Sequence, residues 1–228
     1  NYGYLDKSDR IWLCCKDSII WYNIRTGTTT HMPAPAIGEI ITIEQADGNH
    51  FFIGTGSGLF RAGIGDGSLK LLSDETVESI STPVHELYYH VVSKQLFIGS
   101  YKEGVLIYDM EGTGKIIPCQ SPNNVEINRI VALNAHELLV ATGGKGVYKL
   151  EGFKNEAFQN AVLIQACVEK ESDIAEGCRA VTFQSVLKDG NRYIYVTEDG
   201  FIQLPDKTYS PENSGACYIY DRITAVAG

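Results

Sequence analysis

Five histidines are the first candidates for acid, base or metal-ligand chemistry, and their spacing supports none of these roles. They stand at positions 31, 50, 85, 90 and 136, and no H-E-x-x-H pattern brings two of them onto one zinc ion. No G-x-S-x-G motif supplies the nucleophile of a hydrolase. The sequence therefore gives no support to a metalloprotease or a serine hydrolase.

Two glycine-rich stretches have the composition of a phosphate loop but the wrong setting. The run 54–58 (Gly-Thr-Gly-Ser-Gly) lies between two expected strands, and no helix N-terminus follows it to hold an anion. Gly144-Lys145 is followed by Gly146, where a phosphate loop has Ser or Thr. We interpret both stretches as hairpin turns.

Acidic residues offer one further catalytic option, a glycosidase. Such an enzyme holds two carboxyl groups roughly 5 to 10 Å apart. Glu103, Glu198 and Asp199 fall in equivalent turns of the repeated hairpins described below, and these turns could meet on one rim of the fold. Acidic residues in exposed turns are usually only solvated, so the sequence predicts no catalytic site, no cofactor and no bound metal.

Six cysteines, at positions 14, 15, 119, 167, 178 and 217, show no C-x-x-C spacing, which argues against a zinc site. Most are expected to be small buried hydrophobic residues. If the chain is extracytoplasmic, Cys167 and Cys178, which bracket a polar loop, are the best candidates for a disulfide.

Composition and charge exclude two further classes. The chain has 228 residues, 44% of them hydrophobic and 21% charged, which is typical of a globular domain with a substantial core. A net charge of −9 argues against a nucleic-acid surface, where clustered Lys and Arg neutralise phosphates. The longest apolar runs fall far short of the roughly 20 residues of a membrane-spanning helix. We expect no membrane segment in this sequence.

The elements that must position these residues are repeated hairpins. Residues 49–61 read as two strands around a turn that uses Gly56 and Gly58 for positive φ. The same unit recurs at residues 95–108 and 137–148, with more divergent copies at 10–20 and 192–202. The equivalent turn positions are Ser18, Gly58, Gly104, Gly146 and Gly200, spaced 40, 46, 42 and 54 residues apart.

A strand-rich repeat of forty-odd residues is typical of propeller blades. The sequence therefore predicts an all-β fold, a β-propeller of about five four-stranded blades within a larger ring of about seven. The repeats are expected at 1–38, 39–77, 78–124, 125–176 and 177–221, with a further blade starting at 222–228. We expect a cut blade at each end. The outer edge of the fourth unit is expected within 157–168, and the long, irregular repeat over 153–177 leaves room for a short helix.

One unit resembles a known family. Residues 43–61 (IEQADGNHFFIGTGSGLFR) are similar to the two-component regulator propeller repeat, with an inner strand, Asp-x-x-Gly-Asn, an aromatic residue, Ile-Gly-Thr and Gly-Leu-x-Arg. Residues 103–109, 189–191 and 197–200 match more loosely, and Cys14-Cys15 replaces Gly-Thr in the first unit. The resemblance implies a periplasmic sensor region that recognises a glycan-derived ligand, followed by a β-sandwich, a membrane helix and a histidine kinase.

The turns between second and third strands, with the loops that enter each inner strand, are expected to share one mouth of the propeller, where ligands usually bind. Tyr101 offers an aromatic platform beside charged neighbours. The predicted ligand-binding residues are Tyr101, Lys102, Glu103, Lys145, Glu198, Asp199 and Asp17.

Two functions remain open from the sequence. One is a non-catalytic sensor propeller that binds an oligosaccharide, contacts neighbouring propeller or β-sandwich domains and relays a signal to a histidine kinase. The alternative is a protein-binding scaffold propeller without a small ligand. Because an open ring exposes strand edges, we also expect self-association.

Overall fold

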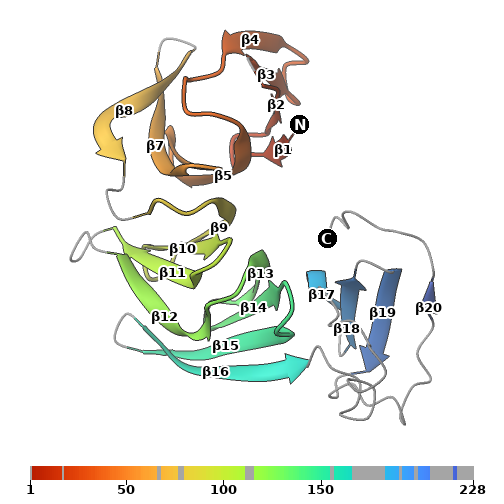
Figure 1. The fold of residues 1–228 in the computed structure, drawn as a ribbon. Helices are drawn as coiled ribbons and strands as arrows, with labels where there is room; N and C mark the ends of the chain where they lie inside the picture. The colour runs from red at the N-terminus through yellow and green to blue at the C-terminus, as the bar shows by residue number, and fades with distance from the viewer. Residues whose placement is uncertain are drawn as a thin grey trace. The chain divides into compact units, whose positions relative to one another are not determined.

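The structure, a computed structural model, describes residues 2–16, 18–65, 68–76, 80–110, 116–154, 157–165, 183–189, 192–197, 200–205 and 218–219. These residues form four-stranded antiparallel sheets in which sequence neighbours pair (Figure 1). The first sheet contains β1 (Tyr2–Leu5), β2 (Arg10–Cys14), β3 (Ser18–Asn23) and β4 (Thr29–Pro33). The second contains β5 (Ile40–Asp47), β6 (His50–Thr55), β7 (Gly58–Gly65) and β8 (Ser68–Thr76).

Three more sheets repeat this order. The third contains β9 (Val84–His90), β10 (Gln95–Ser100), β11 (Gly104–Asp109) and β12 (Ile116–Asn123). The fourth contains β13 (Ile127–Asn134), β14 (Glu137–Thr142), β15 (Val147–Lys154) and β16 (Ala157–Gln165). The fifth contains β17 (Phe183–Asp189), β18 (Arg192–Thr197), β19 (Gly200–Pro205) and β20 (Tyr218–Ile219).

The chain divides into two compact units, residues 1–101 with 106–117 and residues 102–105 with 118–228. In the first unit β1 contacts β5 and β5 contacts β9, so successive sheets meet through their first strands. In the second unit β13 contacts β17 in the same way. Sheets that meet through their innermost strands are blades arranged as in a β-propeller, as the sequence predicts.

An aromatic core joins the first two sheets. Trp12 lies against Trp21 and Phe51, with ring centroids 5.1 and 4.7 Å apart. Ile19 and Ile53 are fully buried in the same cluster. Each such side chain contributes about 1.5–3 kcal/mol through removal of apolar surface from water.

The opposite face of the second sheet packs on the third sheet. Phe52 and Leu59 point away from the first sheet and join Leu96 and Ile98 in a second buried cluster. Phe51 and Phe52 are neighbours in β6 and therefore point to opposite faces. The near-continuous apolar sequence of β6 is thus explained, because both of its faces are covered.

Polar contacts tie the innermost strands together. Lys7, in the turn between β1 and β2, donates from its backbone amide to Gln45 Oε1 at 2.6 Å and from Nζ to the Gln45 carbonyl at 2.7 Å. Its ammonium also lies 5.2 Å from the centroid of the Tyr89 ring in β9. One side chain of the first sheet thereby contacts the second and third sheets.

Glycine is required at two of the predicted turn positions. Gly58 and Gly104 have φ angles of 133° and 82°, which side-chain-bearing residues rarely adopt. A Cβ at either position would lie 2.3 Å from a carbonyl oxygen, of Ile80 and Pro122 respectively. Gly56, also expected to need positive φ, does not adopt it.

The first sheet has four strands, and its β1 has four residues where β5 has eight, which agrees with the expected tail of a strand followed by a turn. Residues 157–165 form strand β16, which pairs with β15 and lies where the outer edge of the fourth unit is expected, so no helix forms over this part of 153–177. Residues 166–177 and the strand expected at 222–226 lie outside the described residues.

Candidate functional site

The predicted rim of the first unit centres on Tyr101, which follows β10. Its backbone amide donates to the Pro83 carbonyl at 2.9 Å, so the turn is fixed to the loop that enters β9. Its ring lies 5.3 Å from the His85 ring at an interplanar angle of 51°. Tyr101 is nevertheless 43% exposed. The two rings form an aromatic surface that a ligand can reach.

The rim of the second unit centres on Asn123. Lys145 Nζ donates to the Asn123 carbonyl at 3.0 Å. A Cβ at Gly104 would lie 2.6 Å from Asn123 Cα, so the turn after Lys102 and Glu103 also approaches this segment. Three of the predicted residues, Lys102, Glu103 and Lys145, are therefore grouped around one short stretch of backbone.

Hydrogen bonds fix the position of Lys145. Thr142 Oγ1 accepts from the Lys145 amide at 3.0 Å and donates to the Gly146 carbonyl at 2.6 Å. The Gly143 amide donates to the Glu126 carbonyl at 2.9 Å. In the second sheet Thr55 makes the corresponding bonds to Ser57 and Gly58. The threonine before each turn is thus a repeated structural device that presents the turn residues.

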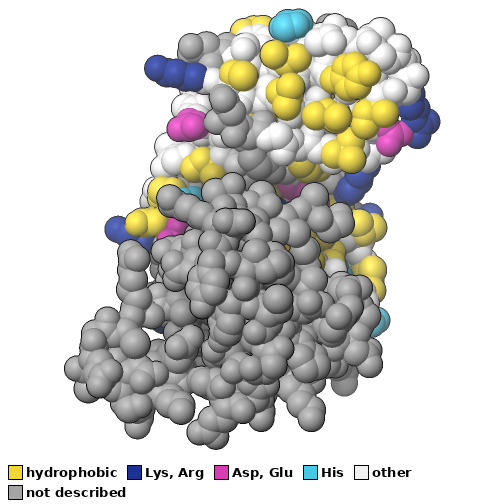
Figure 2. Space-filling view, turned by 90° about the vertical axis from the view of Figure 1, so that its right-hand side faces the viewer, with side chains coloured by type: hydrophobic (Ala, Val, Ile, Leu, Met, Phe, Trp, Pro, Cys, Tyr) yellow, Lys and Arg dark blue, Asp and Glu magenta, His cyan; other side chains and the backbone are white. Residues whose placement is uncertain are grey.

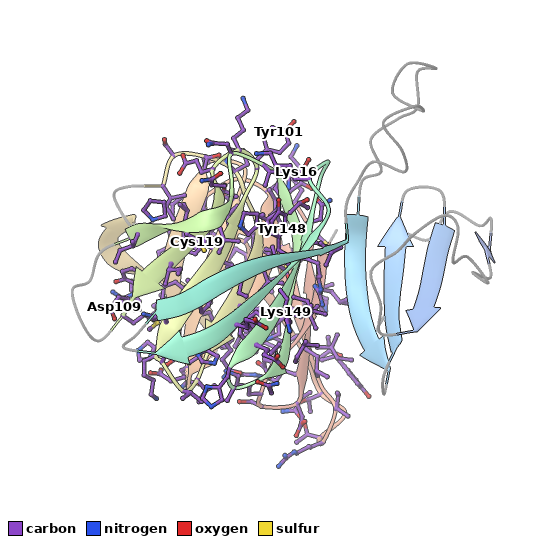
Figure 3. All side chains as sticks on the ribbon, turned by 90° about the horizontal axis from the view of Figure 1, so that it is seen from below. Lys16, Tyr101, Asp109, Cys119, Tyr148 and Lys149 are labelled. Atoms are coloured by element: carbon purple, nitrogen blue, oxygen red, sulfur yellow. The ribbon has the colours of Figure 1, made fainter. Side chains whose placement is uncertain are left out.

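Of the seven predicted site residues, the structure describes four. Tyr101 belongs to the first unit, and Lys102, Glu103 and Lys145 belong to the second. Asp17, Glu198 and Asp199 lie outside the described residues. Figure 3 shows Lys16, the neighbour of Asp17, at the same end of the first unit as Tyr101.

Sequence reasoning missed His85, Asn123 and Glu126. His85 lies near the start of β9, Asn123 is the last residue of β12, and Glu126 directly precedes β13. The available signal was that all three lie at or shortly before the start of an inner strand. No property of the sequence indicated that the ring of His85 would meet Tyr101.

The titratable groups away from the rim are arranged for structure. His50 Nδ1 lies 2.6 Å from Asp47 Oδ1, but both side chains are exposed in the β5–β6 turn. Burial, and secondarily the nearby Glu44 carboxylate, raises the pKa of Tyr88, which keeps its hydroxyl protonated. Among the described residues no group of three or more His, Cys, Asp or Glu is placed to hold a metal ion.

No protein-family model and no curated protein matches the sequence. Solved structures match the fold. The extracellular domain of BT4673 from B. thetaiotaomicron, assigned to a hybrid two-component system, matches with a TM-score of 0.66 at 17% identity, over 95% of this chain and 27% of that one. The extracellular domain of BT3049, from the same organism and also assigned to a hybrid two-component system, matches with a TM-score of 0.60 at 18% identity, over 90% of this chain and 26% of that one.

A third match is the β-propeller domain of Cps50 (Swd1) from Myceliophteria thermophila, with a TM-score of 0.60 at 12% identity, over 87% of this chain and 67% of that one. The chain spans about a quarter of the length of the two B. thetaiotaomicron domains. At these identities the likeness establishes a β-propeller fold. No helix among the described residues has both the length and the hydropathy needed to cross a membrane.

Proposed function

We propose that this chain is a non-catalytic sensor propeller from the periplasmic region of a hybrid two-component system. In this role it recognises a glycan-derived ligand and relays binding to a histidine kinase. The observation that carries the proposal is a shared fold over 95% of the chain with an extracellular domain assigned to such a system. The propeller-repeat pattern in residues 43–61 supports it independently.

The rim geometry suits a sugar. The apolar C–H face of a sugar ring stacks on an aromatic surface, and its hydroxyl groups need donors and acceptors nearby. Tyr101 and His85 supply the rings, and Tyr101 is substantially exposed. Lys102 and Glu103 follow Tyr101 in the chain, and both are exposed.

The same proposal extends to the parent protein. The sheets are blades of a larger ring of about seven, and neighbouring propeller or β-sandwich domains contact it. Ligand binding then acts by favouring one packing of these domains over another. A differential affinity of about 1–3 kcal/mol between two packings is enough to shift a signalling equilibrium by roughly 5- to 150-fold.

Isothermal titration calorimetry of the chain with a panel of plant and host oligosaccharides tests the proposal. We expect at least one oligosaccharide to bind, and Tyr101→Ala to weaken that binding by about tenfold, equivalent to about 1.4 kcal/mol. Tyr101→Phe keeps the ring and should bind nearly as well. Val92→Ala, in the exposed turn at the opposite end of the same sheet, is the matched control and should change nothing.

Two results would contradict the proposal. If no oligosaccharide binds while the chain captures a protein partner, the scaffold function is the better account. If an oligosaccharide binds with equal affinity to wild type and Tyr101→Ala, the ligand site lies elsewhere on the propeller.

A further inference from the structure

One face of the first sheet is apolar and exposed. We call this surface the outer face. Its side chains come from alternate positions of β1, β2 and β3: Leu5, Ile11, Leu13, Ile20 and Tyr22. Leu5, Leu13 and Tyr22 are 58%, 45% and 40% exposed. Figure 2 shows hydrophobic side chains gathered on this side of the first unit.

Strand register joins these residues into two continuous rows. Leu5 pairs with Ile11 and Ile11 with Tyr22, which form one row across three strands. Leu13 pairs with Ile20 to form the second row. The other face of the same strands carries Trp12, Ile19 and Trp21, which are buried against the second sheet. The outer face is therefore an ordered sheet surface and not a scatter of single residues.

The repeat identifies what kind of surface this is. In the repeat, the residues 40 positions after those of the outer face are their equivalents in the second sheet: Gln45, Phe51, Ile53, Phe60 and Ala62. These residues pair in the same two rows, since Gln45 is opposite Phe51, Phe51 opposite Ala62, and Ile53 opposite Phe60. Phe51, Ile53 and Ala62 are buried against the first sheet, and Phe60 packs on the same cluster.

The third sheet uses the same positions. Leu96 and Ile98 of β10 occupy the places of Phe51 and Ile53 and are fully buried against Phe52 and Leu59 of the second sheet. In the second and third sheets alike, that face packs on the preceding sheet. The outer face of the first sheet has the same register and the same apolar character.

We propose that the outer face is a docking surface for a further blade of the same repeat. The partner must present the side of a blade that carries Trp12, Ile19 and Trp21 in the first sheet, or Phe52 and Leu59 in the second. The outer face contains no charged side chain, so a polar ligand gains little there. The proposal rests on the larger ring of blades proposed above and names the face that a further blade covers; it does not depend on ligand binding.

A second copy of the chain fits this surface less well. Two copies related by a twofold axis would bring the outer face against itself. Each blade interface in the first unit instead joins two different faces, one carrying the Trp12 or Phe52 row and the other the Phe51 or Leu96 row. The complement of the outer face is therefore a different surface.

A one-period extension of the chain tests the proposal. Residues 1–40 are duplicated ahead of Asn1, so that the added blade meets the original first sheet as that sheet meets the second. The added copy carries Leu13→Lys, which charges its own outer face. Tyr22→Cys in the original copy places a thiol on the original outer face. The rate at which this thiol is alkylated, followed by peptide mass spectrometry, measures whether the added blade covers that face. A matched control extension carries Ile19→Lys and Trp21→Lys in the added copy, on the face that should dock.

We expect the thiol introduced by Tyr22→Cys to react as an exposed thiol in the unextended chain and at least about tenfold more slowly in the extended chain, because burial blocks the reagent. The control extension should give no protection. Rapid reaction in the extended chain, or equal protection by both extensions, would overturn the proposal. Slow reaction in the unextended chain would also overturn the proposal. If the unextended chain is then a monomer, another part of the chain covers the outer face, and if it is a dimer, a second copy covers it.

A second measurement does not require the added blade to fold. Leu13→Gln in the unextended chain should lower the binding of an apolar dye and leave the urea midpoint of unfolding nearly unchanged, because Leu13 contributes little to the chain's own core. A large fall in the midpoint would show that the face is already packed within this chain, and would contradict the proposal.

Discussion

At the scale of single residues, Asp6 illustrates how a buried charge is made tolerable. Its carboxylate accepts from the amides of Ser8 and Arg10, from Arg10 Nε at 2.6 Å and from Trp12 Nε1 at 2.8 Å. The Asp6 side chain is 0% exposed and that of Arg10 is 13% exposed. The Arg10 guanidinium also lies 4.9 Å from the Trp21 ring. The carboxylate thus links the first turn to the aromatic core.

Asp6→Ala should lower the free energy of unfolding by about 3–5 kcal/mol, because it leaves the Arg10 charge and the Trp12 N–H without their acceptor. Urea denaturation at neutral pH measures the loss. Arg25→Ala is the matched control, since Arg25 pairs with Asp9 on the exposed surface. It should change the free energy by less than about 1 kcal/mol. Equal losses in the two variants would contradict this account of the buried network.

Cys14 should be chemically inert in the folded chain. Burial, and secondarily the neighbouring Cys15, raises the pKa of the Cys14 thiol from 9.0 to about 12. Alkylation at about pH 8 should therefore leave Cys14 unmodified until urea unfolds the chain. Peptide mass spectrometry distinguishes its modification from that of Cys15, and rapid modification of native Cys14 would refute the prediction.

The same shift fixes the sign of a pH dependence. As pH rises above 9.0 the unfolded chain loses the Cys14 proton before the folded chain does. The free energy of unfolding should therefore fall as pH rises from 9.0 towards 12. Urea midpoints in wild type and Cys14→Ala across this window measure the effect, and an equal slope in both proteins would exclude Cys14 as its source.

The sequence predicts residue roles unevenly. Tyr101 was predictable as an exposed rim residue because its turn position follows from the repeat. Asp6 was not, since the offset of 40 residues aligns it with Ala46, a small apolar residue, and nothing in that alignment indicates a buried carboxylate with four donors. The partner of Tyr101 was equally hidden, because ring contacts depend on how the loop before β9 folds.

At the scale of elements, close packing between sheets depends on glycine in β6. A Cβ at Gly54 would lie 2.5 Å from Thr42 Cγ2 and 2.7 Å from Val84 Cγ1. Val84 begins β9, the inner strand of the third sheet. The absence of a side chain at Gly54 therefore lets the second and third sheets approach each other.

Gly54→Ala should destabilise the chain by about 1–3 kcal/mol through overpacking at this contact. Gly56→Ala is the matched control two residues away, where a Cβ would meet nothing within 4 Å. It should stay within about 0.5 kcal/mol of wild type. The urea midpoints of unfolding of the two variants measure this difference. An unchanged midpoint for Gly54→Ala would contradict the account, because the second and third sheets could then separate at no cost.

Hairpins were predictable from sequence because turn glycines and alternating strands recur at nearly constant spacing. The outer strand β16 was predictable only as an edge somewhere within 157–168, since its sequence, AFQNAVLIQ, contains Ala and Asn residues that disfavour strands. Pairing with β15 over most of its length overrides that preference. The edge of a sheet is decided by its neighbour more than by its own composition.

At the scale of the whole molecule, the repeat accounts for the propeller fold but not for its number of blades. Each sheet needs a neighbour on both faces, so periodic hairpins alone predict blades about an axis. The number of blades depends on small rotations between sheets, which a repeat length does not encode. The ligand likewise depends on rim side chains that vary freely because they do not pack in the blades.

Amide NMR of the labelled chain during titration with plant and host oligosaccharides tests the central claim most directly. We expect chemical-shift changes at residues 83–85 and 101–103, none in the opposite turns at 7–9, 47–49 and 91–94, and recovery of the oligosaccharide intact. Shifts confined to the opposite turns, or a cleaved oligosaccharide, would contradict a non-catalytic propeller that senses its ligand at the Tyr101 rim.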